Sequence, residues 1–214
     1  MINMLKVGIT SRVVESETYA EKRDAISHDL TKFMQKINAI PIYIPNSLSD
    51  VKSYTKELKI NALVLSGGDN VGFPPEREKT EHELINFAMK HDIPLLGICR
   101  GMQKINQFFG GYHDKLDTDE HVTKEHQIKI QDKKLLNIFE SETINVNSFH
   151  HNIITQKNLG QDLIPFALSN IDDTIEGFYH KKFPFIGVMW HPEREQKEFD
   201  EVMIYQLFNK NFLK

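Results

Sequence analysis

The sequence of 214 residues contains a single cysteine, Cys99. No disulfide can form within the chain, which fits a reducing compartment such as the cytoplasm. No apolar run approaches the roughly 20 residues of a membrane-spanning helix, and the start of the chain lacks the basic and apolar regions of a signal peptide. These absences predict a cytoplasmic protein that has no membrane partner.

An excess of basic charge is also absent. The chain has 26 Lys and Arg against 30 Asp and Glu, a formal net charge of -4, so nucleic acid is not an expected partner. The Gly-Lys-Ser/Thr sequence of a phosphate-binding P-loop is missing as well. With 40% hydrophobic residues, the length fits one domain over residues 1–214, with a core on both faces of a sheet.

Apolar strand patterns alternate with helical patterns along the first half of the chain. We expect strands at 6–10, 40–45, 62–65 and 93–98, a polar loop at 11–18, and helices at 19–37, 50–58, 76–91 and 101–109. Later strands are expected at 128–130, 143–147, 163–168, 174–179 and 185–190, before a helix at 197–212. The prolines of 40–45 indicate an edge strand. The alternation predicts an α/β fold with a central, mostly parallel sheet flanked by helices.

The lone cysteine stands at a junction of strand and helix. Gly97-Ile98-Cys99-Arg100-Gly101 has the pattern of a nucleophile elbow, in which small neighbours allow a sharp turn that exposes the central side chain. The start of a helix also favours a thiolate. A lone cysteine after an apolar strand is nevertheless more often an inert core residue. The motif alone leaves both interpretations open.

A second motif, His191-Pro192-Glu193, follows the last predicted strand. A cysteine nucleophile needs a base, and the base needs a third group to orient it. Positions two apart in extended chain project to the same side, so Glu193 can reach the His191 ring. The two motifs together predict a catalytic triad of Cys99, His191 and Glu193.

Two loops are candidates for binding. The Gly67-Gly68 pair ends a strand and should face the same crevice as Cys99, where paired glycines can turn N–H groups toward an anion, although a plain turn is the simpler interpretation. The loop 113–126 is rich in acidic residues and histidine, which are metal-ligand types. Its spacing matches no standard site, so we expect no metal and no other cofactor, and a solvated loop or an active-site lid.

Four segments carry a family resemblance: Ser-Gly-Gly-Asp, Gly-Ile-Cys-Arg-Gly-Met-Gln, Asn-Ser-Phe-His-His and Trp-His-Pro-Glu. They resemble the class I glutamine amidotransferases, and within them the gamma-glutamyl hydrolase (peptidase C26-type) branch. The resemblance implies a flavodoxin-like sheet with a nucleophile elbow at Cys99. It implies an oxyanion hole formed by the N–H groups of Gly68 and Arg100. It further assigns substrate contacts to Gly67, Gln103, Ser148 and Phe149.

The resemblance implies hydrolysis of a gamma-glutamyl amide through a thioester on Cys99, with release of glutamate. One alternative is a glutaminase subunit that delivers ammonia to a separate synthase partner. Another is a non-catalytic redox sensor of the same fold. The branch resemblance favours the stand-alone hydrolase, and the intact His191 and Glu193 argue against a sensor. We assign no chemistry to His150 and His151.

The sequence does not identify the leaving group. The branch includes gamma-glutamyl-gamma-aminobutyrate hydrolases and the compact gamma-glutamyl-CDP-amidate hydrolases of capsule phosphoramidate synthesis. A nucleotide conjugate as small-molecule substrate would need cations beside the pocket. Arg12, Arg77 and Lys79 are expected on loops that could supply them, although each singly fits ordinary surface charge.

Overall fold

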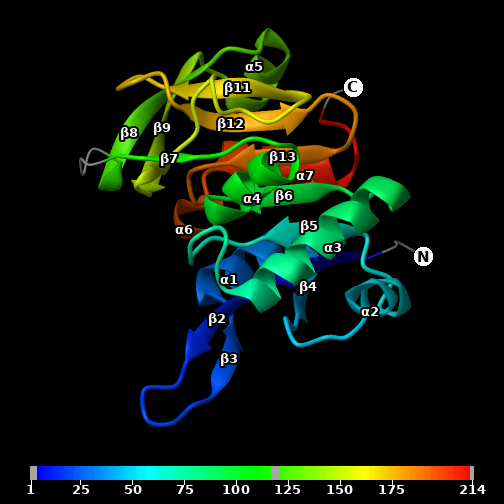
Figure 1. The fold of residues 1–214 in the computed structure, drawn as a ribbon. Coiled ribbons are helices and arrows are strands. Elements are labelled where there is room, and N and C mark those ends of the chain that lie inside the picture. Colours follow the sequence, from blue (N-terminus) through cyan, green and yellow to red (C-terminus); the bar gives the residue numbers. More distant parts are fainter. Residues whose placement is uncertain (1–3, 117–120, 213–214) are drawn as a thin grey trace.

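Figure 1 shows the computed structural model of the chain, which describes residues 4–116 and 121–212. Within these ranges, nine strands form one sheet in the order β4-β1-β5-β6-β13-β12-β11-β8-β9. The five strands from β4 to β13 are parallel and follow the 2-1-3-4-5 order of flavodoxin-like sheets. The other four extend the sheet with antiparallel pairs. The predicted α/β class, with a central sheet flanked by helices, is confirmed.

The predicted strands are all present, several of them longer than expected. The sheet comprises β1 (Leu5–Thr10), β4 (Ala39–Ile44), β5 (Ala62–Leu65), β6 (Leu95–Ile98), β8 (Val122–Ile130), β9 (Thr143–Phe149), β11 (Leu163–Ser169), β12 (Ile175–His180) and β13 (Phe185–Val188). Smaller strand pairs are β2 (Arg12–Glu15) with β3 (Lys22–Ala25) and β7 (Asp114–Lys115) with β10 (Asn152–Ile153). Strand β4 lies at the sheet edge, as its prolines predicted.

The helices are α1 (His28–Lys36), α2 (Val51–Glu57), α3 (Pro75–His91), α4 (Arg100–Phe108), α5 (Leu136–Phe139), α6 (Pro192–Glu195) and α7 (Glu198–Phe208), with a short 3-10 turn at Lys133–Leu135. Helix α2 begins where Asp50 accepts a hydrogen bond from the Ser53 N–H, as a capping residue should. Among residues 4–116 and 121–212, no helix combines the length and apolar character needed to cross a membrane.

Helices cover both faces of the sheet (Figure 1), and each face has its own apolar core. In β5, Val64 packs with residues of α1 and α7, whereas Leu63 and Leu65 pack on the opposite face with residues of α3 and α4. A strand buried on both faces needs apolar residues at every position, which explains the uninterrupted run Ala62–Leu65.

One prediction is wrong between residues 12 and 25. The expected loop at 11–18 and the first part of the expected helix form a hairpin, β2–β3, that extends from the body of the molecule (Figure 1). Helix α1 starts only after Ser27, whose hydroxyl accepts from the Asp29 N–H. Asp24 accepts a hydrogen bond from the Asn46 N–H, 3.0 Å away, and so attaches the hairpin to the loop after β4. This tertiary contact outweighs the helical spacing of the apolar residues.

The expected solvated loop or lid at 113–126 is also wrong in part. His121 is fully buried, and β8 begins directly after it and buries His126. Residues 117, 119 and 120, which belong to the acidic part of that loop, lie outside the described residues. His121 and His126 therefore face the interior, whereas His113 is half-buried.

Candidate active site

Cys99 occupies the turn between β6 and α4 with a φ of 51°, a left-handed conformation that costs a non-glycine residue energy. A Cβ on Gly101 would lie 2.1 Å from the Leu65 carbonyl oxygen, and one on Gly97 would lie 2.6 Å from the Gly101 carbonyl carbon. Both glycines are therefore required by the close packing of the elbow. The Cys99 N–H donates to the Val188 carbonyl at 2.8 Å, which joins the elbow to β13.

His191 and Glu193, the other two residues of the predicted triad, follow β13. The His191 Nδ1 lies 2.8 Å from Glu193 Oε1, and both side chains are buried. Burial lowers the pKa of His191, but hydrogen bonds with Cys99 and Glu193 outweigh it and raise the pKa to about 9. The imidazole is thus held as an imidazolium at neutral pH, beside the sulfur.

Asn147, on β9, holds the His191 backbone on both sides. Its Nδ2 donates to the His191 carbonyl and its Oδ1 accepts from the His191 N–H, both at 2.9 Å. The amide is buried, so these bonds are shielded from water. Our sequence analysis did not select Asn147 as a site residue, although it lies in the Asn-Ser-Phe-His-His segment.

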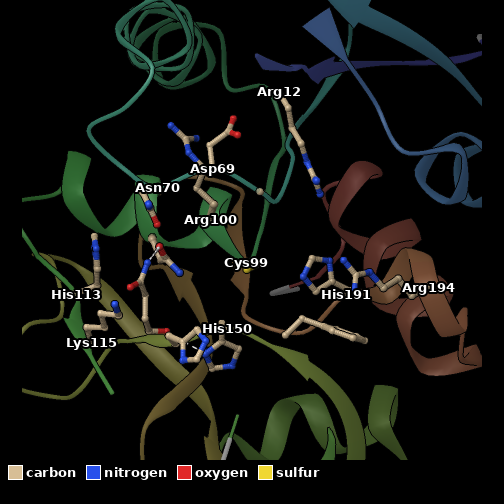
Figure 2. Close-up of a pocket in the computed structure, with 15 residues that line it drawn as sticks. Arg12, Asp69, Asn70, Cys99, Arg100, His113, Lys115, His150, His191 and Arg194 are labelled. Atoms are coloured by element: carbon tan, nitrogen blue, oxygen red, sulfur yellow. Dashed lines mark hydrogen bonds between the residues drawn. The ribbon is translucent and has the colours of Figure 1, made fainter. Parts of the chain in front are cut away.

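Cys99 opens into a cavity of about 600 Å³, drawn in Figure 2. This volume lies in the range of about 300–1,000 Å³ typical of pockets for small molecules. The cavity lies at the carboxyl ends of the parallel strands, where open α/β sheets bind ligands. The residues that were predicted as site residues and that line it are Gly68, Cys99, Arg100, Gln103, Phe149 and His191.

The remaining predicted residues lie next to the cavity. Glu193 stands behind His191, and a Cβ on Gly67 would lie 3.0 Å from the His191 ring. Ser148 is buried, and its hydroxyl donates to the His121 carbonyl at 2.6 Å. Because this hydroxyl is engaged, a substrate contact of Ser148 stays a prediction that concerns its backbone.

Gly68 and Arg100 line the cavity together with Cys99. Gly68 has a φ of 79°, and Arg100 is the first residue of α4, where N–H groups have no acceptor within the helix. The Arg100 guanidinium turns away to pair with Glu78 and Glu81. Any role of Arg100 beside the sulfur therefore belongs to its backbone N–H.

The expected cations differ in their positions. Arg12 lines the cavity, and its Nε donates to the Gly67 carbonyl at 3.1 Å. Arg77 and Lys79 are in helix α3, so the prediction that they lie on loops is wrong. Arg77 is fully buried and pairs with Asp69 at 2.7 Å, which leaves it unavailable to a ligand.

Several cavity residues were missed by the sequence analysis. Figure 2 shows Arg194 near His191, and His113 with Lys115 on the other side of Cys99. The Arg194 guanidinium lies 3.9 Å over the Phe149 ring. Its position next to the triad motif was an available signal, whereas Lys115 reaches the cavity only through the pairing of β7 with β10.

The chain is similar to known proteins over most of its length. The sequence model of the Peptidase C26 family matches residues 6–193. The chain is 35% identical over 198 residues to the gamma-glutamyl-CDP-amidate hydrolase of Campylobacter jejuni, covering 88% of this chain and 90% of that protein. It is 27% identical over 187 residues to a glutamine-hydrolyzing GMP synthase subunit of Methanococcus maripaludis, covering 87% and 89%.

A solved structure shares the fold. A candidate GMP synthase subunit from Thermoplasma acidophilum matches with a TM-score of 0.74, covering 98% of this chain and 94% of that chain. At 23% sequence identity, this similarity concerns the fold alone.

Proposed function

Because this chain belongs to the Peptidase C26 family, we propose that it is a stand-alone gamma-glutamyl amide hydrolase with Cys99 as its nucleophile. The family and the Campylobacter relative identify a hydrolase of the glutamine amidotransferase type rather than a redox sensor. The observation that carries the proposal is the position of Cys99 at the cavity, beside a His191 that is hydrogen-bonded to Glu193.

In the first step, the Cys99 thiolate attacks the side-chain carbonyl carbon of the gamma-glutamyl amide. The N–H groups of Gly68 and Arg100 stabilise the oxyanion, at about 2.7–4 kcal/mol for each donor. The His191 imidazolium protonates the departing nitrogen, and the carbon–nitrogen bond breaks. Its pKa of about 9 keeps that proton available at neutral pH.

In the second step, neutral His191 accepts a proton from water, which attacks the gamma-glutamyl thioester. The carbon–sulfur bond breaks, glutamate leaves, and the thiolate and imidazolium form again. Gln103 and the backbone of Ser148 and Phe149 hold the amino and carboxylate groups of the glutamyl part. The Gln103 amide is at the cavity and accepts from Asn152 Nδ2 at 3.2 Å, which supports a fixed orientation.

We further propose that the leaving group carries phosphate, as in a gamma-glutamyl nucleotide amidate. Three cations of the cavity wall, Arg12, Lys115 and Arg194, make no salt bridge to a carboxylate within the described parts of the chain. Basic side chains without acidic partners suit a phosphorylated ligand. The 35% identity to the Campylobacter enzyme supports the same substrate class.

The second candidate is a glutaminase subunit that passes ammonia to a synthase. The identity of 27% to the Methanococcus GMP synthase chain supports it less strongly than the 35% identity supports the hydrolase. The two functions share the chemistry at Cys99. They differ in whether the chain needs a partner for turnover.

The test is glutamate release by the purified chain alone from L-glutamine, gamma-glutamyl-aminobutyrate and gamma-glutamyl-CDP-amidate. We expect the nucleotide amidate to turn over fastest and Cys99→Ala to lose all turnover. An amidate that turns over no faster than gamma-glutamyl-aminobutyrate would exclude the proposed leaving group. A chain inactive on all three substrates would contradict the stand-alone hydrolase and favour the glutaminase that needs a synthase.

A further inference from the structure

Three buried histidines and a buried glutamate gather at the cavity wall, and one of them, His150, lines the cavity. They are His121 before β8, His126 within β8, His150 after β9 and Glu176 in β12, and each is no more than 6% exposed. The His121 ring centroid lies 5.0 Å from those of both other histidines. The proposed hydrolysis assigns no role to this group.

Each histidine directs a ring nitrogen toward the same carboxylate oxygen. Glu176 Oε1 lies 3.5 Å from His150 Nε2, 3.7 Å from His121 Nδ1 and 3.7 Å from His126 Nε2. These separations exceed those of well-formed hydrogen bonds. None of the four atoms has a hydrogen-bond partner among the residues that the structure describes. Burying polar atoms without partners costs free energy. A bound group at the centre of these four atoms would offset that cost.

The other ring nitrogens show which atoms carry hydrogen. His150 Nδ1 lies 2.9 Å from the Asn152 carbonyl oxygen, which only accepts, so Nδ1 carries the hydrogen. His121 Nε2 lies 3.1 Å from the Asp172 carboxylate and donates in the same way. In their neutral rings, the nitrogens of His150 and His121 that face Glu176 therefore carry lone pairs. No contact fixes the tautomer of His126, because neither of its ring nitrogens has a hydrogen-bond partner among the described residues.

We propose that these residues bind one divalent transition-metal ion, and zinc in particular. Ligands at zinc–nitrogen and zinc–oxygen distances in a tetrahedron are separated by roughly 3.3–3.5 Å. Glu176 Oε1 lies at a similar separation, 3.5–3.7 Å, from the three histidine nitrogens. Ligand atoms of His121, His150 and Glu176 all lie within 4.8 Å of one another. His126 is not part of that group of three, but its Nε2 lies 3.7 Å from Glu176 Oε1, and we assign it as the fourth ligand. Imidazole donors favour zinc over calcium or magnesium.

The surroundings match those of known metal-bound histidines. Such a histidine donates its other N–H to a carboxylate or a carbonyl, which fixes the tautomer and the ring orientation. His121 does so to Asp172 and His150 to Asn152, whereas His126 Nδ1 has no such partner among the described residues. Four protein ligands leave no open position, so the ion is structural and takes no part in the reaction at Cys99.

The ion ties the end of β9, beside the cavity, to β8 and β12 within the antiparallel part of the sheet. The His150 N–H and the Ser148 hydroxyl both donate to the His121 carbonyl, at 3.1 and 2.6 Å. The same segment carries Asn147, which holds the backbone of His191. Loss of the ion is therefore expected to lower thermal stability and to loosen this wall of the cavity.

The test measures metal in the untagged full-length chain by mass spectrometry. The chain is purified, stripped with a chelator, and reloaded with zinc or with cobalt(II). The Cys99→Ala chain is measured in parallel, so that zinc held by the thiolate is not counted. We expect one equivalent of zinc per chain, a raised melting temperature, and the strong visible absorption of tetrahedral cobalt. A wild-type chain that retains well below one equivalent after reloading would overturn the proposal.

A matched pair of variants locates the ion. His150→Gln removes a ligand, whereas His151→Gln changes the adjacent, exposed histidine of the same His-His pair. We expect the first to lose the metal and the cobalt spectrum and the second to retain both. Equal metal content in His150→Gln and the wild type would place the ion elsewhere and refute the site. If His150→Gln fails to fold, the wild-type stoichiometry and spectrum still decide.

Discussion

The charge state of His191 depends on its two neighbours. Burial alone disfavours the imidazolium, and the hydrogen bonds with Cys99 and Glu193 reverse that preference. A raised pKa means that the protonated form predominates until the pH rises through about 9. The proton for the leaving nitrogen is therefore present at neutral pH and absent in strong alkali.

Glu193→Gln should shift this titration. The variant keeps the shape of the side chain but removes the charge that helps to raise the pKa of His191, so the alkaline fall of kcat should move to lower pH. By analogy with other triads, kcat should decrease by roughly 10²- to 10⁴-fold. The measurement is a pH–rate profile. Glu195→Gln, at an exposed position that pairs with Lys197, is the control and should leave the profile unchanged.

Asn147→Ala should weaken the placement of His191. The change leaves the buried N–H of His191 without its partner, at a cost of about 1–3 kcal/mol, whereas the His191 carbonyl loses one of two donors and keeps the Arg194 N–H at 3.2 Å. We expect a lower melting temperature and a lower kcat with little change in KM. Asn145→Ala, an exposed position on the same strand, serves as the control. If the two variants behaved alike, Asn147 would have no positioning role.

At the scale of elements, buried charge connects α3 to α4 and to the glycine loop. Glu81 pairs with Arg77 at 2.9 Å and with Arg100, and it accepts from the Thr10 hydroxyl. Arg77 in turn donates to the Gly68 carbonyl at 3.0 Å. Helix α3 therefore supports both the elbow helix and the loop beside Cys99.

Glu81→Gln should be strongly destabilising. It leaves two buried guanidinium groups with one fewer counter-charge, and breaking such a network typically costs about 3–5 kcal/mol. Urea denaturation measures the free energy of unfolding. Glu83→Gln on the same helix removes only a partly exposed pair with Lys52, 3.8 Å apart, and should cost no more than about 1 kcal/mol. If the free energy of unfolding fell by the same amount in the two variants, the stabilising role of the Glu81 network would be refuted.

At the scale of the whole molecule, the cavity is assembled from segments distant in sequence. Arg12 comes from the hairpin after β1, Lys115 from β7, and Arg194 from α6. Their charges converge on one space, which suits a ligand whose far end carries phosphate. The proposed leaving group therefore depends on how the tertiary structure brings these three segments together.

Lys115→Gln should discriminate between substrates. We expect KM for gamma-glutamyl-CDP-amidate to rise roughly tenfold, since a charge-assisted contact is lost, while KM for L-glutamine stays the same. Steady-state kinetics on both substrates give the answer. Lys124→Gln, at an exposed position on β8, should change neither value. An equal rise for both substrates would place Lys115 near the glutamyl part and count against the proposed leaving group.

The sequence alone determined features that rest on neighbouring residues. The α/β alternation, the edge position of β4, the elbow around Cys99 and the pairing of His191 with Glu193 all depend on local spacing and agree with the structure. Strand and helix periodicity is encoded over a few neighbouring residues, so these features could be predicted from the sequence.

Only the tertiary structure decided what distant segments bring together. Contact between Asp24 and Asn46 fixes a hairpin where the local pattern indicated a helix. Burial joins His121 and His150 to Glu176, although their spacing matches no standard metal site. The physical reason is the same in each case: the free energy of a buried or paired side chain depends on its neighbours in space, and sequence spacing does not contain them.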